Sequence, residues 1–74
     1  RTPEDERRRN EILAAVHLAI EALSEKTRIA FSMNRFDHLT YSKIAEIQGV
    51  SVKTVETQMG RALKSLRDQL AHLL

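Results

Sequence analysis

The residues best suited to chemistry lie in the last third of the chain, where polar and cationic side chains recur at helical spacing. At about 100° per residue, a helix beginning at Val52 gathers four of them and one glycine within about a third of its circumference: Lys53, Thr57, Gly60, Arg61 and Lys64. The opposite side is apolar and holds Val55, Met59, Ala62, Leu66 and Leu70. Such a polar face can enter a DNA major groove, because arginine bonds a guanine edge through two N–H groups and threonine contacts a base edge or a thymine methyl.

Two residues on or beside this face have more than one interpretation. Gly60 permits close approach of a ligand, and a glycine inside a helix otherwise costs about 1 kcal/mol relative to alanine. That unexplained cost favours a functional reason for Gly60. Glu56 lies at the margin of the face, where it can accept a hydrogen bond from a cytosine amino group. It is equally well explained as a solvent-exposed helix former, and the pattern does not separate the two.

The stretch from Thr40 to Gly60 has to position this face. Ile44 and Ala45 belong to one short apolar face, Gly49 interrupts it, and Val52 begins another. A short helix, a tight turn and a longer helix form the helix-turn-helix pattern. The small Ala45 side chain allows the helices to cross closely, and Gly49 accepts the left-handed backbone of a helix end at little cost.

Four helices are expected along the chain, each preceded by a hydroxyl residue that can cap its first turn. The capping residues are Thr2, Ser24, Thr40 and Ser51. The predicted helices run from Pro3 to about Ala22, Glu25 to Phe36, Tyr41 to Gln48 and Val52 to about His72, with Asp37 and His38 as a connector. Phe31 and Phe36 are expected in the core. The N-terminal amides of the third helix, with Thr40 and Lys43 beside them, can meet a phosphate.

Composition indicates one all-helical domain over residues 1–74. Helix-forming residues dominate, and proline and glycine together number three. The chain has no cysteine, which excludes a disulfide framework and fits a reducing cytoplasm. No apolar run reaches membrane-spanning length, so no membrane partner is expected. Because the chain begins with arginine rather than methionine, we expect it to be a segment of a longer protein.

Charge is distributed unevenly between the two halves. Residues 1–38 carry seven basic and seven acidic side chains, whereas residues 39–74 carry five basic and three acidic ones. The whole net charge of +2 therefore belongs to the half with the helix-turn-helix pattern. This excess is a weak indication of a polyanionic partner.

Nothing in the sequence indicates an enzyme. The three histidines, His17, His38 and His72, are scattered, no nucleophile has an evident base, and no metal-ligand or phosphate-loop spacing occurs. We therefore expect no catalytic residue, no metal site and no cofactor.

Taken together, the segments LSEKTRIAF and RFDHLTYSKIAEIQGVSVKTVETQMGRALKSLR resemble region 4, the C-terminal DNA-binding region, of a sigma factor of the extracytoplasmic-function (ECF) type in the sigma-70 family. The similarity runs from about Ile20 to Leu70. It implies an all-α, four-helix domain with a helix-turn-helix, of the winged-helix-like DNA-binding class but without a wing. Four positions depart from the family pattern: Ser24 stands where proline is usual, Ser32 replaces a common apolar residue, Gln48 takes a site that is usually leucine, and Gly60 replaces a larger side chain.

The resemblance also implies a function and a set of contacts. The domain is expected to recognise the −35 promoter element while the intact sigma factor directs RNA polymerase in transcription initiation. By motif position, base edges are expected to meet Glu56, Thr57, Gly60 and Arg61. Backbone or flanking contacts are expected from Thr40, Lys43, Ser51, Lys53, Thr54, Gln58 and Lys64. Further implied partners are the RNA polymerase core, through the flap of its β subunit, and an anti-sigma factor.

Two other interpretations remain open from the sequence. The effector domain of a LuxR-type response regulator has a helix-turn-helix that reads similarly around VSVKTVE. A helical protein-interaction module would carry the same polar face merely as a solvated surface, and it would have no DNA affinity at low salt. The presence or absence of duplex binding separates the last interpretation from the other two.

Overall fold

A computed structural model describes residues 2–73 of the chain, and all of its regular structure is helical. The elements are α1 (Pro3–Glu21), α2 (Glu25–Arg35), α3 (Tyr41–Gln48), α4 (Val52–Leu70) and a short 3-10 turn, η1 (Ala71–Leu73). No strand, and hence no wing, occurs in residues 2–73. The predicted all-α, four-helix class is therefore confirmed, and the predicted helix limits agree with the observed ones to within one or two residues.

The four helices begin where hydroxyl side chains satisfy otherwise unpaired backbone N–H groups. Thr2 accepts from the backbone of Asp5, and the Asp5 carboxylate accepts in return from the backbone of Thr2, which forms a capping box. Ser24, Thr40 and Ser51 accept in the same way from the residue three positions later. All four predicted caps are therefore confirmed, and each fixes where a helix starts.

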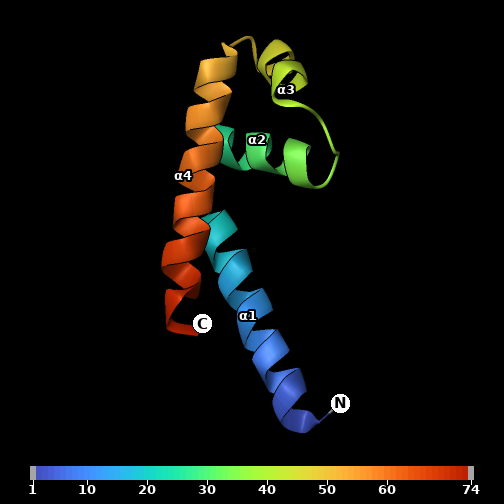
Figure 1. Cartoon of the computed structure of the whole chain (residues 1–74), viewed down its shortest axis with the longest axis vertical. Helices are drawn as coiled ribbons and strands as arrows, with labels where there is room; N and C mark the ends of the chain where they lie inside the picture. The colour runs from blue at the N-terminus through green and yellow to red at the C-terminus, as the bar shows by residue number, and fades with distance from the viewer. Residues whose placement is uncertain (1, 74) are drawn as a thin grey trace.

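α4 is the central helix, and α1, α2 and α3 all pack against it (Figure 1). α3 lies at the end where α4 begins, α2 crosses the middle, and the end of α1 packs against the second half. The first turns of α1 extend away from the rest, which contributes to the elongated dimensions of 46 × 21 × 16 Å (Figure 1). The three neighbouring helices therefore leave one side of α4 open to solvent.

Most of the core is one cluster of apolar side chains between α2, α3 and α4, while Ala15 and Ala19 of α1 are buried outside it. The members of the cluster are Ala30, Phe31, Ile44, Ala45, Val55, Met59 and Ala62. Ile44 and Val55 are completely buried. Partly buried Leu39, Val50 and Leu66 pack around the cluster. Because the apolar residues of α4 are used here, its opposite side must face solvent.

One expected core residue lies outside this cluster. Phe31 is buried as predicted, but the prediction for Phe36 was wrong, because 67% of that side chain is exposed. Phe36 is the C-cap of α2, and five residues place it about 140° around the helix axis from Phe31. It ends beside the core rather than inside it.

Two side-chain hydrogen bonds to backbone carbonyls help to hold the helices in place. The Asn34 amide donates to the carbonyl of Leu39 (2.9 Å), which fixes the connector between α2 and α3. The Ser65 hydroxyl donates to the carbonyl of Ala19 (3.3 Å), which fastens the end of α1 to α4. No helix within residues 2–73 combines the length and apolarity that crossing a membrane requires.

Candidate nucleic-acid interface

The turn between α3 and α4 sets the direction in which α4 leaves the core. Gly49 has the left-handed backbone expected for it, with φ 67° and ψ 35°, and its N–H donates to the carbonyls of Ala45 and Glu46. The N–H of Val50 also donates to the carbonyl of Ala45 (3.0 Å). Because Ala45 is buried and carries only a methyl group, α3 and α4 approach closely beside the turn. The predicted helix-turn-helix is thus present.

A second contact fixes α3 on the body of the domain. The Gln48 side-chain amide donates through Nε2 to the backbone carbonyl of Lys26 at 3.2 Å. This bond ties the last turn of α3 to the first turn of α2. The position of α4 is therefore set by two neighbouring helices and by its own cap.

The solvent side of α4 carries the residues that periodicity placed there. We call this surface the polar face of α4; its members are Lys53, Glu56, Thr57, Gly60, Arg61 and Lys64, all exposed. The structure brings these six together on the side opposite the buried Val55, Met59 and Ala62.

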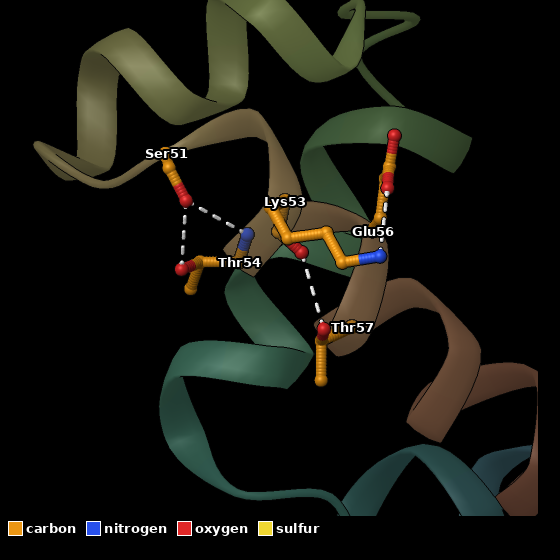
Figure 2. A network of polar contacts seen from close by, with 5 residues as sticks. All are labelled: Ser51, Lys53, Thr54, Glu56 and Thr57. Carbon is orange, nitrogen blue, oxygen red and sulfur yellow. Dashed lines mark hydrogen bonds and ion pairs between the residues drawn. The ribbon is translucent and has the colours of Figure 1, made fainter.

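Short polar contacts organise the first two turns of this face (Figure 2). The Thr57 hydroxyl donates to the backbone carbonyl of Lys53 (3.1 Å), and the Lys53 ammonium lies 3.9 Å from the Glu56 carboxylate. With its hydrogen engaged, Thr57 offers solvent an acceptor oxygen and a methyl group. Glu56 is a partly neutralised acceptor. Both are therefore suited to accept from base amino groups.

The next turn differs because its arginine has no partner among residues 2–73. Arg61 is exposed and makes no hydrogen bond or ion pair with any described residue, so its guanidinium is available to a ligand. Lys64 is engaged instead with Asp68 at 3.0 Å, and both side chains are largely exposed. Gly60 lies beside Arg61, and a Cβ built there meets no atom within 4 Å apart from the local backbone of α4. Packing inside the domain gives no reason for that glycine.

The candidate phosphate contacts at the two helix starts have roles within the fold. The Ser51 hydroxyl accepts from the backbone of Thr54 and shares a hydrogen bond of 3.1 Å with its hydroxyl (Figure 2). Thr40 caps Lys43, and the Lys43 ammonium lies 3.5 Å from Glu46. The four candidate contacts are all exposed, so the same atoms can turn toward a phosphate: Thr40, Lys43, Ser51 and Thr54.

Gln58 does not belong to the exposed surface, which corrects the place expected for it. Only 6% of this residue is accessible to solvent. The reason is helical geometry: three residues after Val55 and four before Ala62, Gln58 falls on the side of α4 that packs against α2.

α2 adds residues to this region that the sequence reasoning missed. Its first turn and the polar face of α4 enclose a cavity of about 370 Å³, to which α2 contributes Ser24, Lys26 and Thr27. Periodicity within one helix could not reveal this, because the cavity depends on how α2 crosses α4. The available signal was a cation two residues after a capping serine, at the start of a helix.

Metal-dependent chemistry has no evident place on this surface. Residues 2–73 contain no group of three or more His, Cys, Asp or Glu residues that could hold a metal ion. The arrangement is instead one of donors, acceptors and cations on a rigid helix, which is suited to recognising a polyanion.

Comparison with known proteins agrees with this geometry. The family described as "Sigma-70, region 4" matches residues 13–66. The RNA polymerase sigma-H factor of Pseudomonas aeruginosa is 36% identical over 73 residues, covering 99% of this chain and 38% of the relative. The ferric citrate uptake sigma factor FecI of Escherichia coli is 35% identical over 63 residues, covering 85% of this chain and 36% of the relative. The chain thus spans little more than a third of these relatives. It belongs to the sigma-70 family, as its region 4, which confirms the resemblance drawn from its sequence.

Proposed function

We propose that this chain binds the −35 element of promoter DNA as region 4 of an ECF sigma factor, which directs bacterial RNA polymerase in transcription initiation. The observation that carries the proposal is the polar face of α4, presented by a helix-turn-helix in a chain of the sigma-70 region 4 family. Its donors and acceptors are exposed and its opposite side is locked into the core. α4 is therefore the helix that enters the major groove.

Within this face, the local contacts of each side chain determine which base group it can recognise. Arg61 is the donor for a guanine edge, because its guanidinium has no partner within residues 2–73 to give up. Thr57 accepts from a base amino group or packs its methyl against thymine. Glu56 accepts from a cytosine amino group once its contact of 3.9 Å with Lys53 loosens. Gly60 leaves room for the groove wall next to Arg61.

Phosphate contacts position α4 in the groove and come from both helix starts. Lys53 and Lys64 flank the base-reading residues on α4 itself. Thr40 and Lys43 lie at the start of α3, and Ser51 and Thr54 at the start of α4, where backbone N–H groups add to their side chains.

The family relationship supports further partners for the intact protein. We infer that the chain is a single domain, residues 1–74, of a longer sigma factor acting in the cytoplasm, and that it docks on the β flap of the polymerase core. The apolar groove between α1, α2 and α4, lined by Val16, Phe31, Phe36 and Leu66 among others, is a suitable surface for that contact. An anti-sigma factor would compete for such a surface. The family match does not favour the LuxR-type alternative, whereas it directly supports the sigma factor.

Substitutions on the polar face test the proposal. Selection from random duplexes first gives the preferred site, and fluorescence anisotropy then measures affinity. Arg61→Ala should weaken binding to that site by about 1–3 kcal/mol and relax the choice of base at one position. Lys64→Ala should weaken all sequences similarly and flatten the dependence on salt. Arg9→Ala, which removes the same charge from the exposed surface of α1, is the matched control. If Arg61→Ala matches this control, α4 does not read DNA through Arg61.

A further inference from the structure

The cavity between α2 and α4 has the chemistry of an anion site. Three cationic side chains line it, Lys26 from α2 and Lys53 and Arg61 from α4, together with hydroxyls from Ser24 and Thr57. No carboxylate is among its lining residues. Two acidic residues are near it along the chain: Glu56 lies 3.9 Å from Lys53 and partly neutralises that cation, and Glu25 is exposed and is not among the lining residues. The cavity is therefore cationic, polar and open to the side that α4 presents to solvent.

A buried amide in the same cavity lacks a partner. Gln58 lines the cavity, is more than nine-tenths buried, and makes no hydrogen bond with any described residue. Its Oε1 is fully enclosed and unsatisfied. Buried polar groups in folded proteins are nearly always hydrogen-bonded. Oε1 is an acceptor and cannot bond a phosphate oxygen, but Nε2, which is not among the enclosed atoms and has no hydrogen-bond partner among residues 2–73, is a donor and matches one.

The first turn of α2 strengthens the site. Ser24 caps it by accepting from the N–H of Thr27 (3.3 Å), and the preceding N–H groups of the turn have no intrahelical acceptor. Such N–H groups and the helix dipole favour an anion. The ammonium group of Lys26, in the same turn, adds a full positive charge to these partial ones.

We propose that this cavity holds a backbone phosphate of the bound DNA and that Lys26 is a DNA contact contributed by α2. The inference rests on the proposed function, since it places a DNA strand along the polar face of α4. Arg61 then reads a base edge while Lys26, across the cavity, binds a phosphate of the adjoining backbone. α2 thereby fixes the depth at which α4 enters the groove.

The test measures how duplex affinity depends on salt for Lys26→Gln and for Arg9→Gln, a matched loss of charge on the exposed surface of α1. Each neutralised phosphate contributes about 0.9 to the slope of log affinity against log salt. Lys26→Gln should therefore lower the slope by about one and weaken binding to every duplex about three- to tenfold at low salt. Its base preferences should equal those of the parent. Arg9→Gln should leave the slope unchanged.

A second variant separates the cavity from a general loss of charge. Gln58→Met keeps the side-chain volume and removes the amide. It should weaken duplex binding about two- to tenfold while leaving thermal stability equal or higher, because an unsatisfied buried group has been replaced by an apolar one. Neutral methylphosphonate linkages, placed one at a time in the duplex, should identify one phosphate whose neutralisation weakens the parent but not Lys26→Gln.

The outcomes distinguish this inference from the function on which it rests. If the parent binds and discriminates among duplexes, but Lys26→Gln keeps the slope of Arg9→Gln and no phosphate depends on Lys26, the inference is overturned and the proposed function stands. If the parent binds no duplex, both are overturned. A lowered slope with a single dependent phosphate supports the assignment of Lys26.

Discussion

The two glycines of this chain provide a matched test of how the helix-turn-helix is built. A Cβ placed on Gly49 or on Gly60 meets no atom of the rest of the domain within 4 Å, local backbone aside, so alanine introduces no packing clash at either site. The backbones differ: Gly49 is left-handed at the end of α3, with φ 67°, whereas Gly60 is inside α4. The same substitution should therefore have opposite effects at the two positions.

The magnitudes follow from the backbone alone. Gly60→Ala should stabilise the fold by about 1 kcal/mol, the difference in helix propensity between glycine and alanine. Gly49→Ala should destabilise it by about 1 kcal/mol, because the left-handed backbone costs an L-residue about 1–2 kcal/mol and the loss of unfolded-state entropy offsets part of this. In a domain of this size the two variants should differ in Tm by about 10 °C.

Thermal and urea unfolding followed by far-UV circular dichroism measure both variants, and anisotropy with the preferred duplex adds the functional readout. We expect Gly60→Ala to be more stable than the parent yet to bind that duplex less tightly, because its methyl group occupies space reserved for the groove. A less stable Gly60→Ala would refute the reasoning, since it would mean that the fold itself requires the glycine. Unchanged DNA affinity would show that the missing side chain has no part in recognition.

Two further substitutions test the electrostatics and the core. Asp68→Asn should raise the affinity for every duplex about two- to fivefold at low salt, as measured by fluorescence anisotropy, because it frees Lys64 from an exposed ion pair of 3.0 Å. An unchanged affinity would mean that Lys64 does not contact DNA. Ile44→Ala should lower the free energy of unfolding, measured in urea, by about 3 kcal/mol, because Ile44 is completely buried. Ile47→Ala, on the exposed side of the same helix, should change it by less than about 0.5 kcal/mol. Equal losses at the two isoleucines would contradict the assigned orientation of α3.

Features that depend on neighbours along the chain could be predicted from sequence. The caps at Thr40 and Ser51 involve atoms three residues apart, and Gly49 ends α3 through its own backbone freedom. The alternation of buried Val55 and exposed Thr57 likewise follows from helical period. These local causes suffice to establish four helices and the polar face of α4.

Features that depend on how helices cross could not be predicted in the same way. Phe36 is apolar, yet it lies at the end of α2 where little packs over it. Gln58 is polar, yet α2 covers it. Its position between the buried Val55 and Ala62 of α4 indicates burial, whereas the family motif indicated a contact with DNA. Lys26 joins the polar face of α4 only because α2 passes beside it. In each case tertiary packing decides what the side chain can contact.

The central claim is that the polar face of α4 binds DNA, and an NMR titration tests it most directly. The labelled domain is titrated at low salt with a mixed-sequence duplex and then with the preferred site. We expect amide shifts concentrated at Thr57, Gly60 and Arg61, with Leu13 and Leu18 on the exposed surface of α1 unchanged. Shifts confined to α1, or none at any residue of α4, would contradict it.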